Sequence, residues 1–144
     1  MTSQAIPPAV RPANATLKVM LWIAQSLIFV AFVFFGFQKL SMPPEALAAM
    51  WNSHWPVEHP QLLRMTGLID TIGGLGILLP SLTRILPHLT VWAARGCVVL
   101  QILAVVFHVS RGEVMVTPLN FVLLALCGFI LWGRSARVPV ASRR

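Results

Sequence analysis

Three polar side chains interrupt long apolar stretches of the sequence, where they could together form a buried polar site. Gln25, Asp70 and Arg95 each lie in a different stretch. If each stretch is a helix rising 1.5 Å per residue, all three lie about eight to ten residues from the same end. A lone charge at that depth of a membrane costs about 2.5–3.5 kcal/mol on insertion scales. We therefore expect an Asp70–Arg95 contact in the protein interior, with Gln25 beside it.

This intramembrane polar layer has two interpretations. Buried polar groups can serve only to fix the register of neighbouring helices. Ionisable residues inside a membrane are also functional candidates by default. The functional interpretation is a site for a polar headgroup, such as a quinone carbonyl, or a proton relay.

A second group of residues, which we call the outer-mouth cluster, is expected at the opposite end of the same stretches. It consists of Lys39, Arg64, His108 and Arg111. Such a cluster either holds an anionic group, for example an oxoanion or a lipid phosphate, or anchors the helices at the interface. His108 is the member best able to exchange protons near neutral pH.

Other residues with possible chemistry give weaker signals. Cys97 and Gln101 are four residues apart and form a polar stripe with His108 on one helix face. Cys97 and Cys127 show no CxxC spacing, so we predict neither a redox dithiol nor a zinc site. The histidines His54 and His59 match no strong zinc motif either, and we expect no metal site.

The elements that carry these residues are predicted from four long apolar runs. The composition is 57% hydrophobic and 10% charged, whereas soluble domains are about 25% charged. Each run is long enough to cross about 30 Å of hydrocarbon. Short links between the later runs require antiparallel neighbours. We predict an all-α integral membrane protein, an antiparallel four-helix bundle with helices at about 17–37, 62–79, 85–109 and 114–132.

The segments outside these runs complete the predicted organisation. Pro44 to Trp51 can form a short interfacial helix between the first two spans, with Trp51 and Trp55 in the headgroup region. Residues 1–14 are expected to form a flexible tail, residues 15–134 the membrane domain and residues 135–144 a basic tail. A cleaved signal peptide is disfavoured, because the first run exceeds the usual apolar length of about 7–15 residues.

The distribution of cations predicts the orientation in the membrane. Seven cations lie at the end shared by both termini and three at the other end. By the positive-inside rule, both termini are expected in the cytoplasm of a cell-membrane protein. The net charge of +7 does not predict nucleic-acid binding, because the cations lie between apolar runs rather than on one amphipathic face.

Several short motifs, in this order, give the chain a family resemblance. The first run ends in Gly36-Phe37-Gln38-Lys39-Leu40, the second carries Asp70 among glycines and closes in Leu79-Pro80, and the third ends in His108 followed by Arg111-Gly112-Glu113. With these motifs the chain, from about Leu17 to Trp132, resembles the DoxX-like family of small four-helix membrane proteins. That family more usually has Glu where this chain has Asp70.

The resemblance implies a limited set of functions. Some relatives are small subunits of membrane oxidoreductases, including thiosulfate:quinone systems. We therefore expect a quinone-interacting or accessory subunit, with a soluble or membrane oxidoreductase partner and no intrinsic cofactor. The alternative is a non-enzymatic protein that binds a lipophilic molecule or assists membrane-protein assembly. A homo-oligomer is compatible with both, and a transporter would need one because four helices make a thin pore wall.

Overall fold

A computed structural model of the chain describes residues 14–143, which fold almost entirely into helices. In chain order the elements are α1 (Ala15–Ser41), α2 (Pro44–Trp51), α3 (Trp55–Glu58), α4 (Pro60–Thr83), α5 (His88–Ser110), the 3₁₀ turn η1 (Val114–Val116), α6 (Thr117–Trp132) and the π-helical turn η2 (Gly133–Arg137). The described residues contain no strand, so the predicted all-α class is confirmed.

Four of these elements are long and apolar enough to cross a membrane. They are α1, α4, α5 and the continuous segment Val114–Arg137, with mean hydropathy between 1.5 and 2.3 in their most apolar windows. Large apolar side chains cover their outer surfaces, for example Val30, Ile72 and Leu103, each more than half exposed. Such a surface is stable only against lipid. The protein is a multi-pass membrane protein.

The boundaries of the helices differ from the sequence prediction mainly at prolines and polar ends. Helix α4 continues through Pro80 to Thr83. A transmembrane helix tolerates the loss of the one backbone hydrogen bond that a proline removes, because neighbouring groups satisfy the freed carbonyl. The chain then breaks at Arg84 and Leu86, whose φ angles of 59° and 49° are left-handed, so α5 starts at His88 rather than at residue 85. The predicted interfacial helix is α2, and the four-residue α3 was not predicted.

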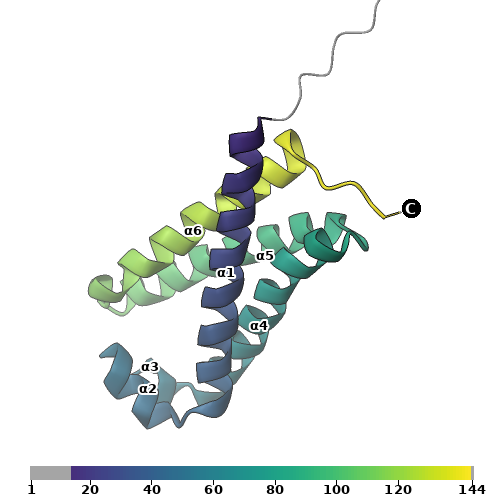
Figure 1. The fold of residues 1–144 in the computed structure, drawn as a ribbon. Coiled ribbons are helices and arrows are strands. Elements are labelled where there is room, and N and C mark those ends of the chain that lie inside the picture. Colours follow the sequence, from purple (N-terminus) through teal and green to yellow (C-terminus); the bar gives the residue numbers. More distant parts are fainter. Residues whose placement is uncertain (1–13, 144) are drawn as a thin grey trace, which may run out of the picture.

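The four long helices surround a common interior, with α1 against α4, α4 against α5, α5 against α6 and α6 against α1. Figure 1 shows the start of α1 near the C-terminal segment at one end, which we call the terminal end. Helices α2 and α3 lie at the other end, which we call the loop end (Figure 1). Helix α6 crosses α1 obliquely in this view, and the antiparallel arrangement of the four-helix bundle remains a prediction.

Of the two predicted tails, the structure describes most of the C-terminal one and only residue 14 of the N-terminal one. Residues 1–13 of the predicted N-terminal tail lie outside the described residues. At the other end, η2 extends the last helical span to Arg137, five residues beyond the predicted helix end at residue 132. Beyond it the chain folds back, and the Arg143 N–H donates to the Arg84 carbonyl at 2.9 Å.

Glycines bring α1 and α4 together near the loop end. A Cβ added at Gly36 would overlap the Thr71 Oγ1 atom and lie 2.8 Å from the Gly67 carbonyl oxygen. A Cβ added at Gly67 would lie 2.8 Å from the Lys39 Cβ atom. Small residues allow such close backbone approach in membranes. This contact fixes which residues of α1 and α4 face each other.

Two apolar clusters fill the ends of the interior. The larger cluster, toward the terminal end, includes Ile28, Ile77 and Cys127. The smaller one, at the loop end, contains Leu47, Trp55 and Leu63. The polar residues of interest are found between these clusters and at their margins.

Candidate functional site

The carboxylate of Asp70 pairs with Lys39. The Lys39 Nζ atom donates to Asp70 Oδ2 at 2.6 Å, and the two side chains are only 17% and 7% exposed. A charge buried in this way must be paired and hydrogen-bonded to be tolerated. The ion pair therefore links the last turn of α1 to the middle of α4.

The direction of helical side chains explains why these two residues meet. Side chains in a helix lean toward its N-terminus. Lys39, near the C-terminus of α1, therefore leans into the interior, whereas Asp70 leans toward the loop end. Gly36 and Gly67, each one turn earlier, bring the two backbones close enough for the contact.

The predicted Asp70–Arg95 contact was wrong. Arg95 is exposed, and its guanidinium lies 4.8 Å from the centre of the Trp92 ring. The same lean accounts for the difference, because α5 begins at the terminal end and its side chains point back toward that end. Long cationic side chains reach the interface in this manner. Equal depth of the Cα atoms did not imply contact between the charged groups.

Gln25 contacts neither Asp70 nor Arg95. Its Nε2 atom donates to the Ile77 carbonyl at 2.7 Å, and its Oε1 atom accepts from Arg134 Nε at 2.7 Å. Gln25 is fully buried. The predicted polar layer is therefore divided between Asp70 with Lys39 and Gln25 with Arg134.

The outer-mouth cluster does not come together as one group. Arg64 donates through Nη1 to the Lys39 carbonyl and through Nη2 to the Met42 carbonyl at 3.1 Å. These are carbonyls at the C-terminal end of α1, where a cation is favourable. Arg64 therefore caps α1, and Lys39 is occupied by Asp70.

The other two members belong to a separate ionic cluster at the loop end. His108 Nδ1 lies 2.8 Å from Glu113 Oε2, and Arg111 donates to both Glu113 and Glu58. Burial alone would raise the pKa of Glu113, but hydrogen bonds from His108 and Arg111 outweigh it and hold that pKa below its ordinary value. The hydrogen bond to Glu58 raises the pKa of Arg111. This cluster joins α3 to the α5–α6 connection.

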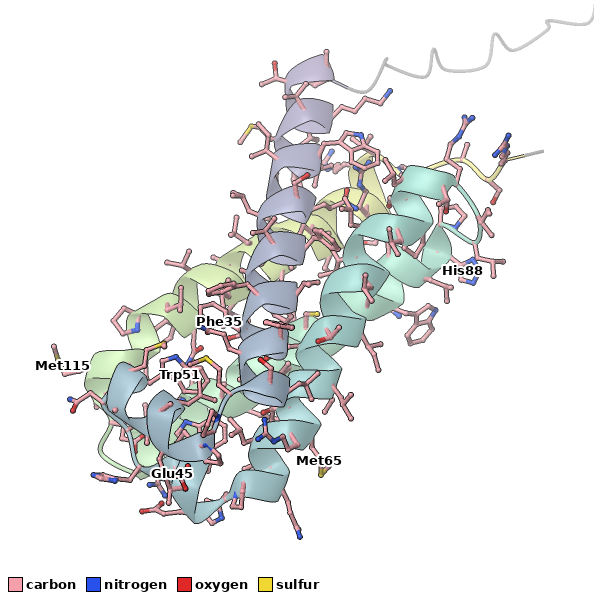
Figure 2. All side chains as sticks on the ribbon, turned by 60° about the horizontal axis from the view of Figure 1, so that its bottom comes forward. Phe35, Glu45, Trp51, Met65, His88 and Met115 are labelled. Atoms are coloured by element: carbon pink, nitrogen blue, oxygen red, sulfur yellow. The ribbon has the colours of Figure 1, made fainter. Side chains whose placement is uncertain are left out.

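A large cavity lies between the two apolar clusters, on the loop-end side of the interior. Its volume is about 740 Å³, within the usual range of about 300–1,000 Å³ for small-molecule sites. Helices α1, α4, α5 and α6 form its walls, and residues from α2 and α3 close it. Most of its lining is apolar and aromatic, including Phe32, Phe35, Trp51, Trp55, Leu100, Phe107 and Leu123. Figure 2 labels Phe35 on α1 and Trp51 on α2, toward the end opposite His88.

Polar groups at a few points of the cavity would orient a ligand. Lys39, Asp70 and His108 line it together with Gln101 and Asn120. Gln101 is 5% exposed, and its Oε1 atom has no hydrogen-bond donor in the described part of the chain. Buried polar atoms are almost always satisfied. The acceptor of Gln101 is therefore available to a bound molecule.

The cavity also reaches the lipid-facing surface. Leu103 and Val106 of α5 and Leu119 of α6 line it, and each is close to half exposed or more. A molecule with an apolar tail can therefore occupy the cavity while its tail remains in the bilayer.

Cys97 and Gln101, which were predicted to form a polar stripe, both lie on α5 but have different roles. Gln101 lines the cavity, whereas Cys97 is buried in the larger apolar cluster. A Cβ added at Gly73 would lie 2.8 Å from Cys97 Sγ. Cys97 is thus a packing residue against α4.

Comparison with known proteins gives one result for the chain. A model of the DoxX-like family matches residues 23–130, well over half of the sequence. The chain belongs to the DoxX-like family. No curated protein and no solved structure matches it.

The motifs by which this DoxX-like chain was identified meet at the cavity. Lys39 comes from the ending of α1, Asp70 from the glycine-rich α4, and His108 from the exit of α5. All three line the same cavity. Three motifs that are separate in the sequence of this DoxX-like protein thus supply its polar wall.

Sequence reasoning missed the aromatic part of the site. Trp51 and Trp55 were assigned to the headgroup region, but their rings stack 6.2 Å apart and both line the cavity. Trp55 also packs edge-on against Phe107. The signal that could have indicated this is the polar, proline-rich segment between the first two spans, whose helices α2 and α3 carry Trp51 and Trp55 to the cavity.

Proposed function

We propose that the cavity of this DoxX-like protein binds a quinone-type molecule, with the ring among the aromatic side chains and the isoprenoid tail in the bilayer. The observation that carries the proposal is a 740 Å³ apolar cavity that contains a buried ion pair and an unsatisfied amide oxygen. Apolar walls with a few convergent polar groups are typical of cofactor sites.

The polar groups suit both redox forms of such a ligand. An ammonium carries three N–H donors, and Lys39 donates one to Asp70, which leaves donors for a quinone carbonyl. The Oε1 atom of Gln101 can accept from the hydroxyl of a quinol. A site with both a donor and an acceptor therefore retains the headgroup before and after reduction.

The protein acts in this proposal as an accessory subunit of a membrane oxidoreductase. The chain itself supplies binding and orientation, and an oxidoreductase partner supplies the two electrons that, together with two protons taken up from water, convert quinone to quinol. The alternative function, binding of another lipophilic molecule without redox chemistry, uses the same apolar walls but does not need the polar groups.

Titration of the purified protein with a short-chain quinone tests the proposal. Trp51 and Trp55 line the cavity, so quinone binding is expected to quench tryptophan fluorescence saturably. With the reduced, quinol form of the same ligand, Gln101→Leu should raise the dissociation constant about tenfold, because the hydrogen bond from the quinol hydroxyl to Gln101 Oε1, roughly 1–1.5 kcal/mol, is lost.

Gln38→Leu is the matched control, because Gln38 lies at the same end but does not line the cavity. It should leave the dissociation constant unchanged. Quenching that does not saturate, or equal effects of the two variants, would overturn the proposal. Saturable binding of a simple fatty acid that ignores Gln101→Leu would favour the alternative.

We further propose that both termini face the cytoplasm. Lys18, Arg84, Arg134, Arg137 and Arg143 lie at the terminal end of the described chain. All four acidic residues of the sequence are elsewhere, three of them at the loop end. This asymmetry satisfies the positive-inside rule.

A further inference from the structure

A second cavity lies at the terminal end, apart from the proposed quinone site. Its volume is about 390 Å³, and it lies between the start of α5, η2 and the C-terminal segment. Figure 2 shows His88, one of its lining residues, at the end of the molecule opposite Met115. Its lining includes the two arginines Arg95 and Arg134.

Arg134, which lines this cavity, is a buried cation with no carboxylate partner in the described part of the chain. The residue is 3% exposed. Its Nε atom donates to Gln25 Oε1 at 2.7 Å and its Nη1 atom to the Val138 carbonyl at 3.3 Å, whereas Nη2 has no acceptor among residues 14–143. The Trp22 ring covers the guanidinium at 4.9 Å. A buried charge in such a state is costly unless a counter-charge is supplied.

The sequence contains no acidic residue that could supply it. Asp70 is paired with Lys39, and Glu58 and Glu113 are paired with Arg111. The fourth acid, Glu45, lies at the start of α2 at the loop end. No acidic side chain of the sequence is therefore left to neutralise Arg134.

The rest of the lining is also suited to an anion. Arg95 stands at the same cavity, stacked on Trp92. Two guanidinium groups beside one cavity repel each other unless an anion lies between them. The cavity is also bordered by Pro87 and His88, at the N-terminal and positive end of α5. The Ser142 hydroxyl can contribute a neutral donor.

We propose that this terminal-end cavity binds a phosphate-type oxoanion, held by Arg134 and Arg95. Guanidinium groups bind phosphate oxygens with strong, charge-assisted hydrogen bonds. The position at the end of the spans allows either a lipid phosphate or a free phosphate to supply this chemistry. The proposal is independent of quinone binding, because the two cavities share no lining residue.

The test measures anion binding to the full chain in an uncharged, phosphate-free detergent. One arm titrates sodium phosphate by calorimetry at constant ionic strength. The other arm adds phosphatidylglycerol, or diacylglycerol as its phosphate-free counterpart, and counts bound molecules by native mass spectrometry. We expect phosphatidylglycerol to bind and diacylglycerol not to bind.

Three variants assign the site. Arg95→Gln removes an exposed guanidinium and should weaken binding about tenfold. Arg134→Lys keeps the charge but loses the planar fork, and should weaken binding by a similar factor. Arg137→Gln is the control, because Arg137 is at the same end, stacks on Trp132, and does not line the cavity.

Each outcome decides the proposal. Binding of both phosphate and phosphatidylglycerol, weakened by Arg95→Gln but not by Arg137→Gln, supports an oxoanion site open to both sources. Binding of phosphatidylglycerol alone, with the same variant pattern, supports a lipid as the source. No binding in either arm, or an equal loss in Arg95→Gln and Arg137→Gln, overturns it. Arg95→Gln decides even if Arg134→Lys does not fold, since Arg95 is exposed.

Discussion

Substitutions in the Lys39–Asp70 ion pair can separate the contribution of the pair to stability from its contribution to ligand binding. Removing one partner of a buried pair leaves an uncompensated charge, whereas replacing both by apolar residues is often close to neutral. The pair also lines the proposed quinone cavity. Variants of this pair can therefore distinguish a structural role from a binding role.

We predict that Lys39→Met alone lowers the free energy of unfolding by about 3 kcal/mol, because it leaves a buried carboxylate. The double variant Lys39→Met with Asp70→Leu should recover most of that loss. Equilibrium unfolding in mixed micelles measures both. A double variant as unstable as the single one would show that the pair is not the isolated unit described above.

The carboxyl of Glu113 predicts a pH dependence at the loop end. Its pKa in the folded protein is lowered, so its contribution to stability is present above the unfolded pKa of about 4.3 and is lost as the pH falls through the folded value. Glu113→Gln should be less stable than wild type at pH 7, and the difference should shrink below about pH 4.

Thermal midpoints of wild type and Glu113→Gln across this pH range measure the effect. A difference between the two proteins that is constant from pH 7 to pH 3 would contradict the assignment of Glu113 as a charged partner of His108 and Arg111.

At the scale of elements, the α1–α4 contact determines the geometry of the site. Gly36 and Gly67 allow the two backbones to touch, and Lys39 and Asp70 lie one turn beyond them. Because the ion pair depends on this approach, a side chain added at the contact should disturb both packing and the cavity wall.

We predict that Gly67→Ala destabilises the protein by about 1–3 kcal/mol, because its Cβ would overpack against Lys39. Gly96→Ala is the matched control in α5, where nothing lies within 4 Å of an added Cβ. It should stabilise the protein by up to about 1 kcal/mol through helix propensity. Unfolding measurements on the two variants test this, and a stabilised Gly67→Ala would contradict the close contact.

The elements were more predictable from the sequence than the contacts between them. The four spans and the interfacial helix follow from apolar length and proline positions, which act locally. Lys39 was placed outside the first helix because the apolar run ends at residue 37, but α1 continues to Ser41. Arg134 is one of the seven cations that the sequence places at the end shared by both termini, and only the fold shows it buried. Partner choice depends on side-chain direction and helix crossing, which periodicity does not contain.

At the scale of the whole molecule, the two ends differ in charge. The terminal end holds cations without acids in the described chain, whereas each of the three loop-end glutamates lies near a cation or at the start of a helix. We predict that green fluorescent protein fused to the C-terminus is fluorescent and that alkaline phosphatase fused there is inactive, as cytoplasmic location requires. Active phosphatase would reverse the orientation.

The cavity is the feature that unites the helices, the interfacial segment and the motifs of the DoxX-like family. Ala104 lines it from α5, and Ala104→Trp would fill part of its volume while leaving Lys39 and Asp70 themselves unchanged. A bulky side chain at position 104 should therefore displace the bound molecule by filling its space, without changing any polar residue of the cavity.

Mass spectrometry of the small molecules that co-purify with the protein tests the central claim most directly. Wild-type protein extracted from its native membrane should carry a quinone, and Ala104→Trp, purified in the same way and equally folded, should carry little or none. Wild-type protein without quinone, or equal amounts of quinone in both proteins, would contradict the proposed site.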